Sequence, residues 1–260
     1  MTDSAALKLK RAAKRIAELD TFLRNEQPFT YVVQTDIITG ERATLAKKNE
    51  AVAAEAAVIA GDAIHNIRSA LDHAYWDIVS PFATTEGEKR AIQFPFCEKE
   101  ARLQEVVKNR LAHRVSDRFF QSVMNLRPHS EARGNRLLYL IERLDIPDKH
   151  RELVPSGNFT RVSGQMLKEQ IPDFPGGFVG MFGFGMCRRD AVWKNARVQR
   201  DWLGELVPPT THLFEKKLDV PVDIVFAIGE LGTIAPMIPT LNKMVDEARD
   251  AINLLRLAAP

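Results

Sequence analysis

The sequence predicts an α+β protein: a helical bundle with an N-terminal β-hairpin, followed by a β-rich region and a C-terminal helix. Early in the chain, apolar residues recur at steps of three and four, the period of amphipathic helices. In the same part of the chain, two segments with alternating apolar and polar residues flank a glycine-containing turn, which is typical of a hairpin. Later, proline and glycine interrupt short apolar runs, as between strands. We expect residues 1–152 to form the bundle and residues 153–260 the β-rich region with its closing helix, sharing one core.

The composition is that of an ordinary globular protein. Of 260 residues, 45% are hydrophobic and 27% charged, and the net charge of +2 is too small for a global attraction to nucleic acid. The two cysteines lie far apart, which argues against a disulfide scaffold or a cysteine-based zinc site. No signal-peptide pattern and no apolar run of roughly 18 residues, the length of a membrane span, occurs. We expect a cytoplasmic protein with no membrane partner and no cofactor.

Two long helices are expected around the hairpin. The first covers about residues 4–25 and has one apolar face. The hairpin strands follow at 29–36 and 41–48. The second long helix ends near Ser80, because Pro81 disfavours helical geometry in the residue before it.

The rest of the bundle is expected to consist of shorter helices. They are predicted at 98–112, 116–126 and 133–146, and the last is closed by Pro147. The apolar seam of residues 239–258 predicts the C-terminal helix.

Residues 61–78, GDAIHNIRSALDHAYWDI, carry the most informative pattern. At 100° per residue, one side of this helix is an apolar stripe. The opposite side is a polar stripe, and a charged flank lies between the two. The polar stripe is Asp62, Asn66, Ser69 and His73, and the flank is His65, Arg68 and Asp72. We expect the polar stripe to be partly buried and to need partners, because an unpaired buried polar group costs about 1–3 kcal/mol.

A second polar cluster, DIPDKHREL at 145–153, follows the helix that Pro147 is expected to close. Its charged residues would lie on a turn: Asp148, Lys149, His150 and Arg151. A histidine beside cations suits an anionic ligand, because the cations stabilise negative charge and imidazole moves protons. An ion-pair cluster that ties the turn to the long helix is the alternative. We expect any site to lie where the polar stripe meets this turn.

These two motifs together resemble a family of uncharacterised bacterial proteins. Its members carry a GD-xx-HN-x-RS-x-LDH helix followed by a DKHR turn, and the similarity covers roughly residues 30–155. The resemblance implies the pairing of the two motifs and no particular activity.

The arginine–histidine spacing of the helix is also similar to the signature of HEPN-type domains, which are helical bundles that cleave RNA. The resemblance implies a metal-independent ribonuclease in which Arg68 stabilises the scissile phosphate and His73 is the general acid or base. The 2′-hydroxyl of RNA would attack, and Lys149, His150 and Arg151 would line the anion pocket. The resemblance to HEPN-type domains also implies a homodimer. An unbroken helix, however, would place Arg68 and His73 about 140° apart.

Two other functions stay open. A metal-binding hydrolase could use some of five potential ligands, although no HExxH motif is present; they are Asp62, His65, His73, Asp148 and His150. The hypothesis of a binding or assembly protein with a structural polar core requires the fewest independent assumptions, and we prefer it. Whether the protein is an enzyme stays open. Its partners would be a second copy of the chain, and RNA or another anionic ligand.

The first helix carries cations off its apolar stripe: Lys8, Arg11, Lys14 and Arg15. We expect a solvated face, with a surface for RNA or a protein partner as the alternative.

Overall fold

Helices make up most of the described residues of the computed structural model. The structure describes residues 3–36, 42–150, 156–159, 169–170, 183–185, 192–194, 213–218, 223–226 and 235–260. The chain divides into two compact units built from separated stretches. Unit 1 combines Met1–Phe22, Ala56–Val154 and Ile238–Pro260, and unit 2 combines Leu23–Glu55 and Pro155–Met237. The sequence interpretation, by contrast, divided the chain at residue 152 into two continuous stretches.

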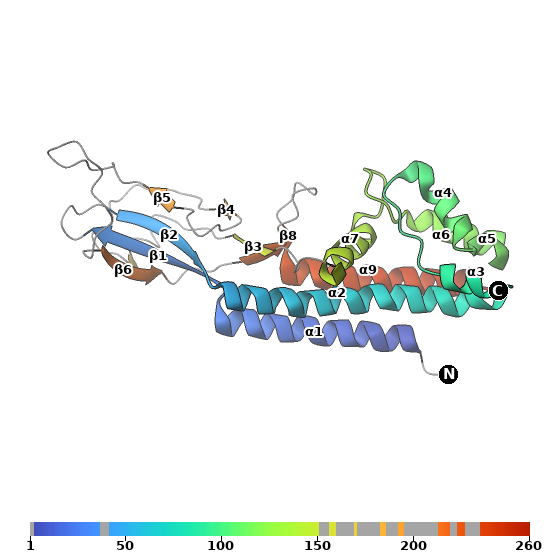
Figure 1. Ribbon diagram of the computed structural model, residues 1–260, viewed down its shortest axis with the longest axis horizontal. Helices are drawn as coiled ribbons and strands as arrows, with labels where there is room; N and C mark the ends of the chain where they lie inside the picture. The colour runs from blue at the N-terminus through green and yellow to red at the C-terminus, as the bar shows by residue number, and fades with distance from the viewer. Residues whose placement is uncertain are drawn as a thin grey trace. The chain divides into compact units, whose positions relative to one another are not determined.

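Three long helices form the body of unit 1 (Figure 1). They are α1 (Ser4–Glu26), α2 (Glu50–Val79) and α9 (Met237–Ala258). Ion pairs join them along the bundle. Arg15 of α1 lies 3.1 Å from Asp62 of α2, and Arg256 of α9 lies 2.7 Å from Asp3, next to the start of α1.

The ends of α1 and α2 follow from local sequence. Asp3 Oδ1 caps α1 by accepting a hydrogen bond of 3.0 Å from a first-turn N–H. Asn49 Oδ1 caps α2 in the same way at 3.3 Å. A 3-10 turn, Ser80–Phe82, follows α2 and contains Pro81, so the helix stops where the proline was predicted to stop it.

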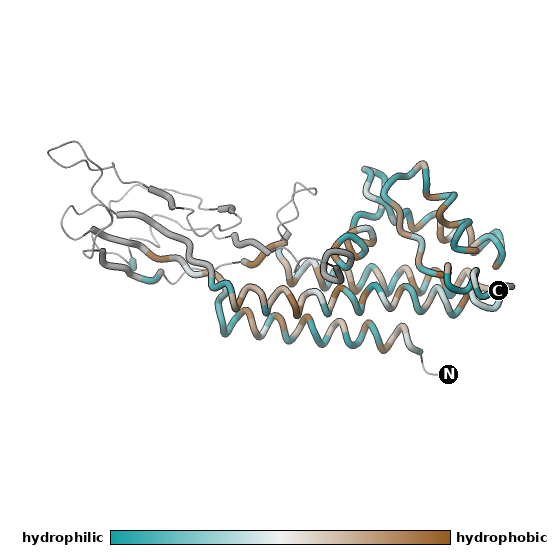
Figure 2. The backbone as a smooth tube through the Cα atoms, viewed as in Figure 1, coloured by the Kyte–Doolittle hydropathy of each residue, from teal (hydrophilic) through white to brown (hydrophobic). Residues whose placement is uncertain are grey.

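The core of unit 1 is made by apolar side chains at three- and four-residue steps, and Figure 2 shows hydrophobic positions recurring along each long helix. Fully or almost fully buried examples are Ile16 and Leu19 of α1, Ile64, Ile67 and Leu71 of α2, and Leu241, Met244 and Leu255 of α9. Each such side chain stabilises the fold by about 1.5–3 kcal/mol relative to an exposed one.

Shorter helices complete unit 1. They are α3 (Glu86–Ala91), α4 (Glu100–Asn109), α5 (Ala112–Val115), α6 (Asp117–Leu126) and α7 (Arg136–His150). The buried Tyr75 of α2 packs its ring against Phe94, with centroids 6.2 Å apart, and against Phe119 of α6 at 5.9 Å. Its hydroxyl donates a hydrogen bond of 3.0 Å to the carbonyl of Arg110, so one side chain ties α2 to the end of α4 and to α6.

The strands belong to unit 2. β1 (Phe29–Asp36) and β2 (Arg42–Lys48) pair antiparallel, with Val33 opposite Thr44. They are flanked by β6 (Leu213–Leu218) and β5 (Val192–Lys194) in the order β5-β2-β1-β6. A second set of short strands has the order β4-β3-β7-β8. These are β3 (Ser156–Phe159), β4 (Gly183–Gly185), β7 (Asp223–Phe226) and β8 (Ala235–Pro236).

The prediction of an α+β fold with a β-rich second half is wrong. The described residues are mostly helical, and the strands assigned beyond residue 153 have only two to six residues each. Proline and glycine mark where regular structure is interrupted, but they do not determine that strands fill the intervals. In addition, α9 supplies core side chains to the helical unit 1.

Candidate functional site

Arg68 of α2 is surrounded by carboxylates from two helices of unit 1. Its Nη1 lies 2.8 Å from Asp145 Oδ2 and its Nη2 lies 3.2 Å from Glu142 Oε2, both on α7. Asp72, one turn further along α2, lies 3.8 Å from Arg68 Nε. Only 14% of the Arg68 side chain is exposed, so these are largely desolvated ion pairs. Together with His65, these residues are called the Arg68 cluster below.

Asp145 is the centre of the Arg68 cluster. Its side chain is fully buried, and its second oxygen, Oδ1, lies 3.0 Å from His65 Nδ1. The other ring nitrogen of His65, Nε2, lies 3.4 Å from Ser69 Oγ. The two carboxylate oxygens of Asp145 therefore contact two side chains that are one turn apart on α2, which fixes the position of α7 along that helix.

A loop covers one side of the Arg68 cluster. Asp72 Oδ1 accepts a hydrogen bond of 2.9 Å from the backbone N–H of Phe94. The ring of Phe96 lies with its centroid 5.9 Å from Arg68 Cζ, within the range of a cation–π contact. Both phenylalanines belong to the QFPF segment that follows α3, so this loop is attached to the cluster by a carboxylate and by the guanidinium.

Opposing effects act on the Arg68 guanidinium. Burial disfavours its charge, but the hydrogen bond to Asp145 and the charges of Glu142 and Asp72 outweigh burial and raise the pKa of Arg68 above its ordinary value. The guanidinium is thus held in its charged form with its donors directed at carboxylates. Binding a phosphate through Arg68 would require these ion pairs to break.

The polar stripe of α2 is more exposed than the sequence predicted. Asp62 and His73 are exposed, whereas Asn66 and Ser69 are partly buried. Asn66 Nδ2 donates a hydrogen bond of 2.7 Å to the carbonyl of Asp62 within the helix. The polar groups of the stripe therefore find their partners in solvent, in Arg15 of α1 and in the backbone of their own helix.

The structure does not bring Arg68 and His73 together. α2 is unbroken between the two residues, and five steps of 100° place their side chains about 140° apart around the helix. Arg68 faces α7, and His73 is exposed.

The predicted turn at Asp148–Arg151 is wrong for its first three residues. α7 continues through Pro147 to His150, because a proline biases the preceding residue away from helix without forbidding it. The side chains of Asp148, Lys149 and His150 lie outside the described residues, as does all of Arg151.

The sequence interpretation gave no role to Asp145, although this residue opens the DIPDKHREL cluster, and it missed Glu142; both contact Arg68 of α2. A signal for Asp145 is present in the sequence. Leu138, Ile141 and Asp145 occupy successive steps of three and four, and all three are buried. An acidic residue on a buried apolar seam requires a cationic or hydrogen-bonding partner, and that requirement could have identified it.

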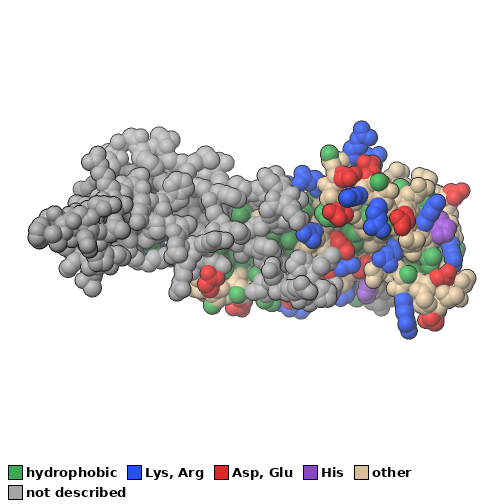
Figure 3. Space-filling view, turned by 45° about the horizontal axis from the view of Figure 1, so that its top comes forward, with side chains coloured by type: hydrophobic (Ala, Val, Ile, Leu, Met, Phe, Trp, Pro, Cys, Tyr) green, Lys and Arg blue, Asp and Glu red, His purple; other side chains and the backbone are tan. Residues whose placement is uncertain are grey.

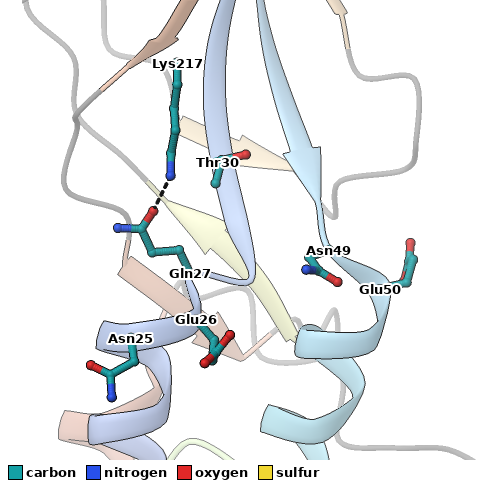
Figure 4. A pocket seen from close by; sticks show the side chains of 7 residues that line it. All are labelled: Asn25, Glu26, Gln27, Thr30, Asn49, Glu50 and Lys217. Atoms are coloured by element: carbon teal, nitrogen blue, oxygen red, sulfur yellow. Dashed lines mark hydrogen bonds between the residues drawn. The ribbon is translucent and has the colours of Figure 1, made fainter.

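A polar pocket in unit 2 was not predicted. Its volume is about 550 Å³, and it lies where the end of α1, the first strand and the start of α2 meet (Figure 4). The lining residues are Asn25, Glu26, Gln27, Thr30, Asn49, Glu50 and Lys217. Lys217 Nζ donates a hydrogen bond of 2.9 Å to Gln27 Oε1, and all lining residues except Thr30 are exposed. The pocket is therefore wide open to solvent.

Comparisons of this chain with protein-family models, with curated proteins and with solved structures gave no match. Within the described residues, no three His, Cys, Asp or Glu side chains are placed to hold one metal ion. None of the helices that the structure describes combines the length and hydropathy that a membrane span needs.

Proposed function

We propose that the chain is a binding or assembly protein in which the Arg68 cluster has a structural role. The observation that supports this function is the engagement of Arg68. Two of its nitrogens face Asp145 and Glu142 at 2.8 and 3.2 Å, and Asp145 is fully buried. A buried ion-pair network with defined partners on two helices favours one packing arrangement over others.

The proposal extends to the partners expected from the sequence, which are a second copy of the chain, and RNA or another anionic ligand. A surface, and not the Arg68 cluster, would bind the anion, because the donors of Arg68 are already directed at carboxylates.

A double-mutant cycle tests the structural role. Asp145→Leu alone and Arg68→Met alone should each destabilise the protein by about 3–5 kcal/mol, because each leaves a buried charge without its main partner. Arg68→Met combined with Asp145→Leu should recover much of that loss, because both charges are then replaced by apolar groups. The measurement is urea unfolding followed by circular dichroism.

The matched control pair is Arg249 and Asp246 of α9, which are 2.6 Å apart and exposed. Neutralising either residue should change stability by less than about 1 kcal/mol. If neutralising a residue lowers the free energy of unfolding equally at the two pairs, the Arg68 cluster does not have the proposed structural role.

Incubation with mixed RNA, with and without EDTA, tests the enzymatic alternative. We expect no cleavage, and we expect His73→Ala to leave stability within about 0.5 kcal/mol because its side chain is exposed. RNA cleavage by the wild-type protein that is lost in a stably folded His73→Ala variant would contradict the proposed function.

A further inference from the structure

The outward face of α1 carries a cluster of cations directly opposite its buried seam. The five buried residues of α1 are Ala5, Leu9, Ala12, Ile16 and Leu19. At 100° per residue, all five lie about 140–180° from Lys14, and Lys10 and Arg11 lie about 40° and 60° to either side of Lys14. All three cationic side chains are exposed. They are called the α1 cationic face below.

No acidic side chain of the described residues pairs with the α1 cationic face. The acid on this side of the helix, Glu18, is bound by Arg15, with Oε2 2.7 Å from Nη1. Arg15 in turn reaches Asp62 of α2 at 3.1 Å. Four cations thus stand against two carboxylates on this side of α1, which leaves a net positive charge there among the described residues. Over the described part of the face shown in Figure 3, cationic and anionic side chains are interspersed.

The spacing of the cations suits a regular array of negative charges. Lys10 and Lys14 are about 6 Å apart along the helix axis, and duplex DNA carries about one charge per 1.7 Å of its axis. Several phosphates thus fall within reach of two long, flexible side chains. The one aromatic residue of α1, Phe22, is partly buried and lies about 12 Å along the helix axis from Lys14, so no row of aromatic side chains is available to stack on successive unpaired bases, and a duplex backbone fits better than a single strand.

Other anionic surfaces fit less well. Leu7 is the one large apolar residue exposed on this side of α1, with 54% of its surface accessible. A single leucine supplies too little apolar area to anchor a helix in a lipid headgroup region, where a continuous apolar face is needed.

We propose that the α1 cationic face binds the phosphate backbone of a double-stranded nucleic acid without reading its sequence. This inference rests on the proposed binding function and names its partner. It does not depend on the Arg68 cluster, so the double-mutant cycle and the binding measurement below can fail separately.

The test is fluorescence anisotropy of the full chain with short RNA and DNA duplexes over a range of salt concentrations. The variant Lys10→Gln/Arg11→Gln/Lys14→Gln keeps good helix-forming residues and removes the three charges. We expect this variant to bind at least tenfold more weakly at about 50 mM salt. We also expect its negative slope of log affinity against log salt to become shallower by about 2–3.

A matched variant removes three exposed lysines elsewhere in unit 1: Lys99→Gln/Lys108→Gln/Lys243→Gln. It has the same net charge and should retain nearly wild-type affinity. The proposal fails if the wild-type protein does not bind either duplex, or if both triple variants lose affinity equally. It also fails if poly-glutamate or anionic phosphatidylserine vesicles bind as tightly as the duplexes, since an acidic protein or a membrane would then be the better partner.

Discussion

At the scale of single residues, very tight packing occurs at His129 and Gly134, in the loop before α7. His129 is fully buried, and neither of its ring nitrogens has a hydrogen-bond partner among the described residues. A Cβ added to Gly134 would overlap the carbonyl oxygen of His129 and lie 2.6 Å from its Nδ1. Both contacts are far closer than van der Waals contact, so the loop closes only because residue 134 has no side chain.

Gly134→Ala should therefore destabilise the protein by about 1–3 kcal/mol, the usual cost of overpacking. Gly87→Ala is the matched control, because a Cβ there would meet only Thr85 Oγ1 at 3.9 Å, and alanine favours helix α3 by about 0.5–1 kcal/mol. Urea midpoints should move in opposite directions. A similar shift in both variants would show that the contact at His129 relaxes freely.

At the scale of elements, α3 is held by one carboxylate at its first turn. Glu88 Oε1 lies 2.6 Å from Arg114 Nη2 of α5. Its Oε2 accepts hydrogen bonds from the backbone N–H and hydroxyl of Thr84 at 2.7 and 2.9 Å, and Thr85 completes a capping box. Arg114 first, and then the bonds from Thr84, lower the pKa of Glu88 to about 2.

The lowered pKa gives α3 a defined pH dependence. A carboxyl with a lowered folded-state pKa stabilises the protein above its ordinary pKa of 4.5, and this contribution is lost as the pH falls toward about 2. The melting temperature of wild-type protein should exceed that of Glu88→Gln at pH 6, and the difference should shrink between about pH 4.5 and 2. A difference independent of pH would mean that the charge of Glu88 does not stabilise α3.

Elements governed by local signals were predictable, and those governed by distant contacts were not. The start of the first helix near residue 4 and the end of the second before Pro81 depend on residues only a few positions away, so the sequence indicated both correctly. The partner that lies closest to Arg68 is Asp145, which is 77 residues away, and no local pattern links the two. The outcome at Pro147 was also unpredictable, because the helical bias of Leu144 and its neighbours competes there with the bias of the proline.

At the scale of the whole molecule, unit 1 depends on a helix from the far end of the chain. Leu241 of α9 is fully buried, whereas Leu254 of the same helix is 51% exposed. Leu241→Ala should cost about 2–5 kcal/mol, and Leu254→Ala should stay within about 0.5 kcal/mol. Thermal unfolding followed by circular dichroism compares the two. If the two variants melt at the same temperature, α9 does not complete the core of unit 1.

The interleaved units also determine the order in which the protein can fold during synthesis. The ribosome makes α1 and α2 first, but it must translate the whole of Pro155–Met237 before it begins the rest of α9. At about 5–20 residues per second, this takes several seconds. During that time the buried faces of α1 and α2 lack the helix that covers them. The nascent chain therefore presents an exposed apolar surface at the tunnel exit, where chaperones can bind, until Leu255 and its neighbours emerge.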